Sequence, residues 1–320
     1  MDTTNNLEVV HDVFPYLKVY KNGTIKRLVG TEFAPATYDT QTGVTSKDVL
    51  LNPKTGLSAR IYLPNSTTKS KKLPLVVYFH GGAFCISSVG DPKYHDSLNV
   101  FVSTANVVLV SVDYRLAPEH PLPTAYDDSW YVLKWVAAHN FKQGTDVWLQ
   151  EFVDFDSVFL AGDSAGANIS HFMAIRAGKS DEDIGIKISG MLMINPYFWG
   201  EEPIGIEIKD PVRKSMVDNW WEFVCPSNKG NNDPLINPFV DEAPSLEELA
   251  CDRVLVCVAE LDILRERGIL YYEYLVESRW KGKVEMIETK GEDHVFHIFN
   301  PKSEKALDLV KCWADFINGK

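Results

Sequence analysis

Residues 156–168 read Asp-Ser-Val-Phe-Leu-Ala-Gly-Asp-Ser-Ala-Gly-Ala-Asn, an apolar strand pattern that runs directly into Gly-x-Ser-x-Gly and then into a helix pattern. In such a strand–turn–helix, small glycines let the strand and the helix approach closely, and the central serine occupies a strained turn. The serine hydroxyl then stands above the sheet edge at the helix N-terminus, where the helix dipole favours developing negative charge. The stretch therefore predicts a nucleophile at Ser164.

Short apolar runs on both sides of this stretch predict the rest of a sheet. They are rich in β-branched residues and alternate with helix-compatible stretches such as 125–139 and 167–177. Near-continuous apolar strands that alternate with helices are typical of a mostly parallel sheet flanked by helices. A strand pair at 47–51 and 58–63, with a turn at 53–56, is expected before it. The predicted sheet strands lie at 73–79, 107–112, 158–161, 188–194, 254–259 and 284–288.

The sequence His-Gly-Gly-Ala-Phe at 80–84 follows the first of these strands. Attack of a serine on an acyl carbon creates an oxyanion, which needs backbone N–H donors that are already in place. The N–H groups of Gly81 and Gly82 are expected to donate, together with the N–H of Ala165 after the nucleophile. His80 is expected to brace this loop without transferring protons. A phosphate-binding loop is excluded, because neither of the usual glycine-rich phosphate motifs is present.

An acid and a histidine follow the serine in the chain order that a catalytic triad on such a sheet requires. Asp262 comes after the predicted strand 254–259, at the carboxyl end where open α/β sheets bind ligands. It is expected to hold the tautomer of His294, the predicted general base. Glu260 remains an alternative to Asp262 as the orienting acid, and His297 remains an alternative to His294 as the general base. The His-x-x-His spacing of residues 294 and 297 also suggests the hypothesis of a metal site. No carboxylate-bearing helix accompanies this spacing, so no metal is expected.

The overall charge is acidic, with 44 Asp and Glu against 32 Lys and Arg and a net charge of −12. Such a surface repels phosphate backbones and anionic lipids, so neither nucleic acid nor a membrane is an expected partner. No signal segment or bilayer-length apolar run is visible, which indicates a cytoplasmic protein. The five cysteines are scattered, so no disulfide or zinc site is expected. Three of them lie in apolar runs and are expected to be buried: Cys85, Cys257 and Cys312.

Two regions interrupt the alternation of strands and helices. Residues 1 to about 45 precede the first strong strand signal, and residues 196 to 250 separate two predicted strands by far more than a usual connection. Both regions flank the predicted chemistry along the chain. We therefore expect a single domain over residues 1–320, with cap elements at about 1–45 and 196–250 that cover the site.

Four tracts together resemble the plant carboxylesterase branch of the hormone-sensitive lipase family, and the resemblance extends over nearly the whole chain. It implies an α/β-hydrolase fold, and it supports Ser164, Asp262 and His294 as the triad with residues 80–82 as the oxyanion motif. Together with the motifs it indicates hydrolysis of a small-molecule ester through an acyl-enzyme. We expect no cofactor, and we expect the protein to act as a monomer or homodimer. The tracts are His80-Gly-Gly-Ala-Phe, Asp113-Tyr-Arg-Leu-Ala-Pro-Glu-His-Pro-Leu-Pro, Gly162-Asp-Ser-Ala-Gly-Ala-Asn and Gly291-Glu-Asp-His-Val-Phe.

Within that branch, further tracts resemble the 2-hydroxyisoflavanone dehydratase-like members. In dehydratases of that group threonine often stands at the nucleophile position, where this chain has Ser164. One alternative function is therefore a dehydratase or cyclase of plant specialised metabolism, in which the same base removes a proton. Another is a non-catalytic hormone receptor, although such relatives lack the histidine that His294 supplies. The tracts are Pro196-Tyr-Phe-Trp-Gly, Asn237-Pro and Leu249-Ala-Cys-Asp-Arg.

The aromatic side chains of the 196–250 region indicate a pocket for a small aromatic or terpenoid-like ester. These side chains are equally consistent with ordinary core packing within the 196–250 region. These aromatic residues are Tyr197, Phe198, Trp199, Trp220, Trp221 and Phe223. The side chains expected to bind substrate are Ala83, Phe84, Asp163, Tyr197, Trp220 and Val295.

Overall fold

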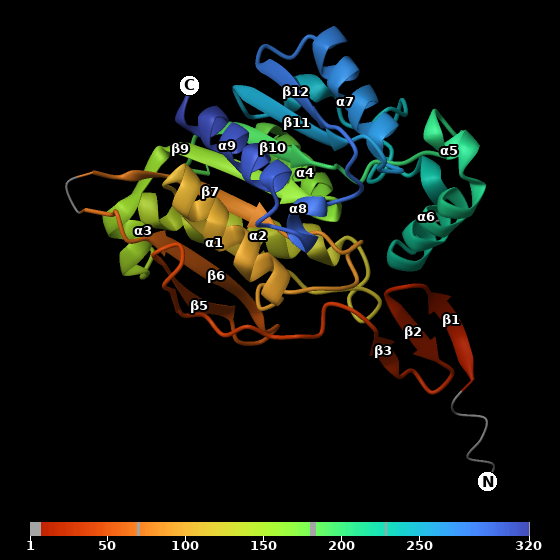
Figure 1. Cartoon of the computed structure of the whole chain (residues 1–320), viewed down its shortest axis with the longest axis horizontal. Coiled ribbons are helices and arrows are strands. Elements are labelled where there is room, and N and C mark those ends of the chain that lie inside the picture. Colours follow the sequence, from red (N-terminus) through yellow and green to blue (C-terminus); the bar gives the residue numbers. More distant parts are fainter. Residues whose placement is uncertain (1–7, 69–70, 180–183, 228, 320) are drawn as a thin grey trace.

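The computed structural model describes residues 8–68, 71–179, 184–227 and 229–319, so the first seven residues of the predicted N-terminal cap region lie outside it. Within these residues one large sheet has the strand order β12-β11-β10-β9-β7-β8-β6-β5-β4 (Figure 1). Strands β7 to β12 pair in parallel, and β4 to β6 add an antiparallel edge. Their bounds are β4 (Tyr38–Asp39), β5 (Val44–Asn52), β6 (Leu57–Pro64), β7 (Leu73–Phe79), β8 (Val108–Asp113), β9 (Val153–Asp163), β10 (Ile188–Ile194), β11 (Arg253–Ala259) and β12 (Lys283–Thr289).

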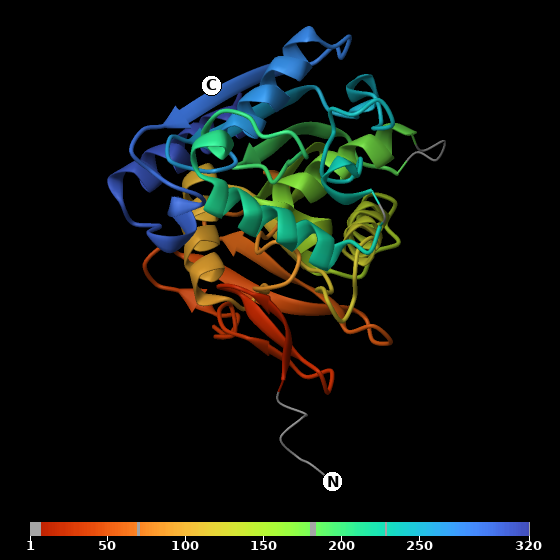
Figure 2. The same cartoon turned by 90° about the vertical axis from the view of Figure 1, so that its right-hand side faces the viewer.

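Helices cover both faces of this sheet (Figures 1 and 2). On one face α1 (Pro92–Ala105) packs against α9 (Glu304–Asn318), with the short α8 (Phe296–Phe299) beside them. On the other face lie α2 (Thr124–Asn140), α4 (Ala165–Lys179) and α7 (Arg265–Glu277). The remaining helical elements are α3 (Val147–Phe152), α5 (Ile206–Lys209), α6 (Pro211–Val224), η2 (Gly230–Asn232) and η3 (Leu246–Glu248).

Alternate residues of the central strands point to two separate hydrophobic layers. In β9, Leu160 packs in the layer of α2 and α4, whereas Phe159 and Ala161 pack in the layer of α1 and α9. A strand that is covered on both faces needs apolar residues at successive positions, because its side chains alternate from face to face. The near-continuous apolar runs follow from this arrangement, which confirms the predicted α/β fold with a mostly parallel sheet.

The predicted strands are all present, and β9 extends furthest beyond its predicted bounds. Strand β9 begins at Val153 rather than at residue 158. Its first residues, which include Asp154 and Asp156, are polar and concealed the start of the strand. The pairing of Leu73 with Val153 and of Pro74 with Asp154 carries the ladder into this polar stretch, so strand pairing overrides local composition here.

A small antiparallel sheet of β1 (Val9–Val13), β2 (Leu17–Tyr20) and β3 (Ile25–Arg27) lies beside α6, as Figures 1 and 2 both show. The Arg27 guanidinium joins it to the main body by donating to the carbonyl oxygen of Cys85 at 2.8 Å and to that of Ala117 at 3.0 Å. It also forms a salt bridge of 2.7 Å with Glu119. The N-terminal segment is therefore tied directly to the loop that follows the predicted oxyanion motif.

All five cysteines are free, and the prediction of which are buried is partly wrong. Cys85 and Cys257 are buried as expected, but so are Cys225 and Cys251, whereas Cys312 is partly exposed. On α9 the buried positions follow a helical repeat through residues 309, 310, 313, 314 and 317, which leaves position 312 off the buried face. No helix in the described part of the chain has the length and apolarity needed to span a bilayer.

Candidate active site

The carboxyl ends of neighbouring parallel strands bring the predicted site residues together. His80 follows β7, Ser164 follows β9, and Asp262 and His294 follow β11 and β12. In an open α/β sheet these strand ends face one crevice, which is where such sheets bind ligands. Ser164 and His294, which are 130 positions apart in the chain, therefore meet at one edge of the sheet.

The strand–turn–helix around Ser164 has the strained geometry that the sequence predicts. Ser164 lies between β9 and α4 with a positive φ of 53°, a region that non-glycine residues rarely adopt. Its N–H donates to the carbonyl oxygen of Ile194 at 2.9 Å, and its carbonyl oxygen accepts from the N–H of Tyr197 at 3.0 Å. A Cβ at Gly166 would collide with the carbonyl oxygen of Phe79, so glycine is required where the helix crosses the neighbouring strand.

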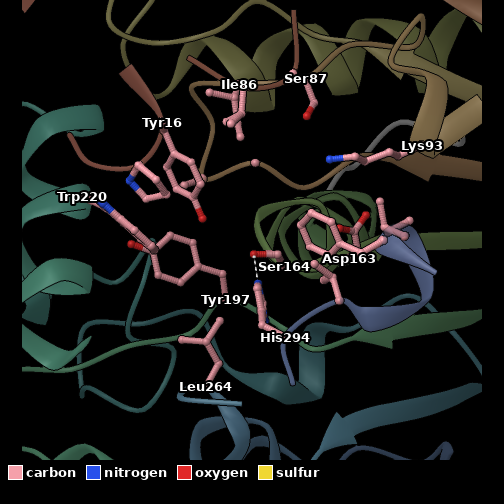
Figure 3. A pocket seen from close by; sticks show the side chains of 18 of the residues that line it. Tyr16, Ile86, Ser87, Lys93, Asp163, Ser164, Tyr197, Trp220, Leu264 and His294 are labelled. Atoms are coloured by element: carbon pink, nitrogen blue, oxygen red, sulfur yellow. Dashed lines mark hydrogen bonds between the residues drawn. The ribbon is translucent and has the colours of Figure 1, made fainter. Parts of the chain in front are cut away.

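Ser164, His294 and Asp262 form a continuous hydrogen-bonded chain (Figure 3). The distance from Ser164 Oγ to His294 Nε2 is 2.9 Å, and His294 Nδ1 lies 2.8 Å from Asp262 Oδ2. An ionised carboxylate can only accept, so Nδ1 carries the proton and Nε2 accepts from the serine hydroxyl. This tautomer is the one in which the imidazole can remove the hydroxyl proton of Ser164.

The carboxylate of Asp262 is completely buried and is held by two further donors. Its Oδ2 accepts from the side-chain amide of Asn195 at 3.0 Å, and its Oδ1 accepts from the N–H of Leu264 at 2.9 Å. Asn195 was not singled out in the sequence. The available signal was its position directly after strand β10, at the same carboxyl edge as the other site residues.

The environment of His294 favours its charged form more than water does. Burial lowers the pKa of His294, but the charge of Asp262 and the hydrogen bond with it raise that pKa by more. The carboxylates of Asp163 and Asp293 add to the increase, so the pKa of His294 lies above the ordinary value of a histidine. A base with this tuning can hold a proton taken from a nearby hydroxyl while remaining largely neutral at higher pH.

Neither rival residue occupies a position in this chain of contacts. Glu260 accepts from the N–H of Gly291 at 2.8 Å and pairs with Lys290 at 3.3 Å. His297 is buried against the Trp313 ring, with ring centroids 5.2 Å apart, and burial lowers the pKa of His297 to about 3. Among the described residues, no group of three or more His, Cys, Asp or Glu side chains is arranged to hold a metal ion.

The loop at 80–84 corrects one predicted oxyanion donor. The N–H of Gly81 is already engaged, since it donates to Tyr94 Oη at 2.9 Å and to Asp163 Oδ1 at 3.1 Å. Gly82 and Ala83 line the cavity over Ser164, whereas Gly81 does not. Ala165 begins α4 directly after the serine, so its N–H belongs to the helix N-terminus. The structure therefore does not leave the predicted Gly81 N–H free to donate, whereas Gly82 and Ala83 are the loop residues that lie beside the cavity.

Asp163 is one of the two groups that occupy the Gly81 N–H. Its fully buried carboxylate accepts from the hydroxyls of Tyr78 and Tyr94, each at 2.7 Å, as well as from the Gly81 N–H. Burial raises the pKa of Asp163, and the two tyrosine hydrogen bonds oppose that increase. The carboxylate thus anchors the start of the loop to the residue beside the predicted nucleophile.

His80 supports the same loop from its other side. Its Nδ1 lies 2.8 Å from the carbonyl oxygen of Gly81, and its ring stacks on Tyr114 with a centroid separation of 4.3 Å. The Tyr114 hydroxyl donates to the carbonyl oxygen of His80 at 2.7 Å. Burial lowers the pKa of His80, which keeps this ring neutral and suited to bracing the loop.

A cavity of about 550 Å³ opens over Ser164 and His294, a size suited to a small-molecule ligand. In Figure 3 Ser164 and His294 lie between Leu264 on one side and Tyr16 and Ile86 on the other. The predicted substrate-binding side chains of Ala83, Asp163, Tyr197, Trp220 and Val295 line this cavity.

Phe84 is the exception among the predicted substrate-binding residues. It is only 1% exposed and packs beneath the cavity against the rings of Tyr197 and Trp221, so its assignment to substrate binding is corrected. Of the six aromatic residues predicted to form the pocket, Tyr197 and Trp220 line it. The other four lie in or against the hydrophobic core: Phe198, Trp199 and Trp221 are buried in it, and Phe223 is partly buried against it. The aromatic cluster is therefore divided between cavity lining and core packing, and the substrate class stays a prediction.

Two further residues reach the site from segments that carried no sequence motif. Tyr16 lines the cavity from the turn between β1 and β2, and its ring lies 4.8 Å from that of Trp220 on α6. Arg213 of α6 donates to the carbonyl oxygen of Leu261 at 3.1 Å and to Asp293 Oδ1 at 3.0 Å. Leu261 and Asp293 directly precede Asp262 and His294, so α6 is joined to both loops that carry them.

Comparisons with known proteins bear on the fold and the family of the chain. A profile of the α/β-hydrolase fold matches residues 76–298, and a profile of the carboxylesterase family matches residues 29–119. Probable carboxylesterase 2 of Arabidopsis thaliana is 58% identical over 99% of both chains. A 2-hydroxyisoflavanone dehydratase of Glycyrrhiza echinata is 44% identical over 98% of both chains. An esterase of Pyrobaculum calidifontis superimposes with a TM-score of 0.69 at 28% identity, over 86% of this chain and 84% of that one.

Proposed function

The chain belongs to the plant carboxylesterase family of α/β hydrolases, and we propose that it hydrolyses small aromatic or terpenoid-like carboxylic esters through an acyl-enzyme on Ser164. The observation that carries the proposal is the hydrogen-bonded chain of Ser164, His294 and Asp262 at the floor of a cavity of about 550 Å³. Nucleophile, base and orienting acid are the three groups that acyl transfer to a serine requires.

In the proposed reaction, His294 Nε2 takes the proton of Ser164 Oγ as that oxygen attacks the ester carbonyl. The resulting oxyanion accepts hydrogen bonds from the N–H groups of Gly82, Ala83 and Ala165. His294 then gives its proton to the departing alcohol, and Asp262 stabilises the imidazolium in between. Water, activated by the same histidine, attacks the acyl group and releases the acid. Every proton moves between His294 and the reacting oxygens.

The substrate class follows from the side chains around the cavity. Its walls are mainly apolar, with Val29, Ile86, Met216 and Leu264 beside the rings of Tyr16, Tyr197 and Trp220. A pocket of this kind favours an uncharged apolar ligand whose orientation is set by a few polar groups. We propose that the N-terminal segment and the 196–250 region act as the cap, because Tyr16 and Trp220 bring side chains from both of them to the cavity.

One observation favours a second candidate function, a dehydratase reaction on the same scaffold. The dehydratase of Glycyrrhiza echinata resembles this chain over almost its whole length. In such a reaction His294 would remove a proton next to a carbonyl group, and the oxyanion donors would hold the enolate. The enolate would then expel the β-hydroxyl group, which takes up the proton from His294 and leaves as water. Elimination needs no covalent bond to Ser164, so the two candidates differ in how far they depend on that hydroxyl.

We also propose a cytoplasmic location and action as a monomer or homodimer on a small molecule, without nucleic acid or membrane partners. Five free cysteines, four of them buried, suit a reducing compartment. The net charge of −12 disfavours contact with phosphate-rich surfaces. Imaging of a fluorescent fusion and sedimentation of the purified protein test these two statements.

The pH dependence of ester hydrolysis tests the proposed role of His294. We expect kcat/KM for 1-naphthyl acetate to rise with pH, with a midpoint above the usual histidine value of about 6.5. The sign follows from the mechanism, because the protonated imidazole cannot accept the serine proton and Asp262 raises the pKa of His294. The measurement is initial rate against pH, corrected for hydrolysis in buffer alone.

Glu260→Gln is the matched control for this profile. Glu260 contacts Gly291 and Lys290 rather than His294, so the midpoint should stay where it is in the wild type. A rate that does not change across this pH range, or a midpoint that moves with Glu260→Gln, would contradict the assigned base and its carboxylate partner.

A further inference from the structure

A second cavity of about 480 Å³ lies between β1 and α6, next to the active-site cavity. The two cavities share two lining residues, Met216 and Trp220, both on α6. A side chain that lines two cavities forms part of the wall between them. The substrate pocket and the second cavity are therefore neighbours at Met216 and Trp220, which lie on their common border.

Trp220 is the larger of these two side chains, and its position depends on the N-terminal segment. Its ring packs at 37° against Tyr16, with centroids 4.8 Å apart, and Trp220 itself remains partly exposed. The carbonyl oxygen of Tyr16 accepts from the N–H of Leu28 at 2.7 Å, which fixes the turn that carries the tyrosine. The rings of His11 on β1 and Phe223 on α6 also line the second cavity, and their centroids lie 5.7 Å apart.

The second cavity differs in chemistry from the pocket over Ser164. It combines the aromatic rings of Phe14 and Phe223 with the polar side chains of Asp12, Asn219 and Glu222. Asp12 is paired with Lys18 at 2.9 Å, whereas Glu222 has no cationic partner among the described residues. Neither Lys nor Arg lines the cavity, so its local charge is negative. A negative lining repels an anionic group and accepts neutral hydroxyl-bearing or cationic groups.

We propose that the second cavity is a subsite for the far end of an elongated ester whose reacting carbonyl lies at Ser164. The subsite takes a neutral, hydroxyl-bearing end and disfavours a carboxylate, and Trp220 together with Met216 limits how readily it is entered. This inference rests on the proposed ester hydrolysis, since it assigns a further part of the same substrate. It adds a substrate class, long esters with an uncharged polar end, to the small apolar esters that fit the first cavity alone.

The first test is a comparison of p-nitrophenyl acetate with p-nitrophenyl decanoate. Trp220→Ala and Met216→Ala each open the wall, so each should raise the decanoate-to-acetate ratio of kcat/KM by about tenfold over the wild type. Val212→Ala is the matched control on the same helix, because Val212 is exposed and lines neither cavity, so it should leave the ratio within about twofold of the wild type. Adding Phe223→Trp to Trp220→Ala refills the second cavity and should return the ratio toward the wild-type value.

The second test concerns charge at the far end. With Trp220→Ala, the p-nitrophenyl ester of 10-hydroxydecanoic acid should be hydrolysed about tenfold faster, in kcat/KM, than the p-nitrophenyl half-ester of sebacic acid. Glu222→Gln in the same background should narrow this gap, and high salt should narrow it as well, because exposed charges are screened. The two esters have the same chain length and differ in charge at one end.

Circular dichroism and thermal melting establish that each variant is folded, and Met216→Ala provides the same test if Trp220→Ala is unfolded. An unchanged decanoate-to-acetate ratio in both wall variants would overturn the subsite, as would an equal change in Val212→Ala. Failure of the wild type to hydrolyse p-nitrophenyl acetate would instead contradict the proposed function. The two proposals therefore fail through different measurements.

Discussion

Replacement of Ser164 by alanine is expected to lower kcat for ester hydrolysis by about a millionfold, which is the scale seen when a triad nucleophile is removed. The change deletes one oxygen atom, Oγ, which lies 2.9 Å from His294 Nε2. Without it the acyl-enzyme cannot form, while the base and the oxyanion donors remain. The measurement is hydrolysis of 1-naphthyl acetate by the purified variant, against the rate without protein.

The same variant separates hydrolysis from elimination. A dehydratase that uses His294 as its base keeps its base and its oxyanion donors in Ser164→Ala, so dehydration of a β-hydroxyketone should largely survive. Ester hydrolysis should not. Retention of ester hydrolysis in a folded Ser164→Ala variant would contradict the acyl-enzyme, and survival of dehydration alone would favour the second candidate function.

Replacement of Asp262 by asparagine is the second large effect, with an expected loss of about 10⁴-fold in kcat. Asn195 already donates to Asp262 Oδ2, and Leu264 donates to Oδ1, so the new amide meets donors on both sides. If its NH₂ group faces His294, the proton of that ring moves from Nδ1 to Nε2, and Nε2 can no longer accept from Ser164. The nucleophile is present in this variant, but its base is in the wrong tautomer.

Two measurements distinguish this cause from general damage. The Asp262→Asn variant should retain a thermal unfolding midpoint near that of the wild type, because the side chain keeps its size and most of its contacts. Glu260→Gln serves as the comparison at the nearest acidic residue and should retain nearly full activity, since Glu260 pairs with Lys290 on the surface. A larger loss in Glu260→Gln than in Asp262→Asn would reverse the assignment of the acid.

The parts of the fold that could be predicted are those specified by local sequence pattern. Strands β7, β8, β10 and β11 are buried on both faces, and their continuous apolar runs show this directly. The first residues of β9 could not be predicted, because their polar sequence becomes a strand only through pairing with β7. Cys312 was misplaced for a related reason, since its burial depends on which face of α9 meets the sheet.

The residues of the candidate site also fall into two groups, those that local sequence indicates and those that only tertiary contacts place. Ser164, Asp262 and His294 could be predicted because each follows a recognisable strand, and parallel strands end at one edge. Gly81 was wrongly assigned because the direction of its N–H depends on Tyr94 and Asp163, and no local pattern shows that contact. Tyr16 and Arg213 come from segments whose position over the site is set by tertiary packing. The sequences around these two residues do not differ from those of an ordinary polar loop or amphipathic helix, so they did not indicate a place in the site.

The most direct measurement is reaction of the folded protein with a fluorophosphonate probe, followed by mass spectrometry of the labelled peptide. We expect covalent modification at Ser164, no modification in Ser164→Ala, and slow modification in His294→Ala, where the base that activates the hydroxyl is missing. Absence of labelling in folded wild-type protein, or labelling at a different residue with Ser164 unmodified, would contradict the claim that Ser164 is an activated nucleophile.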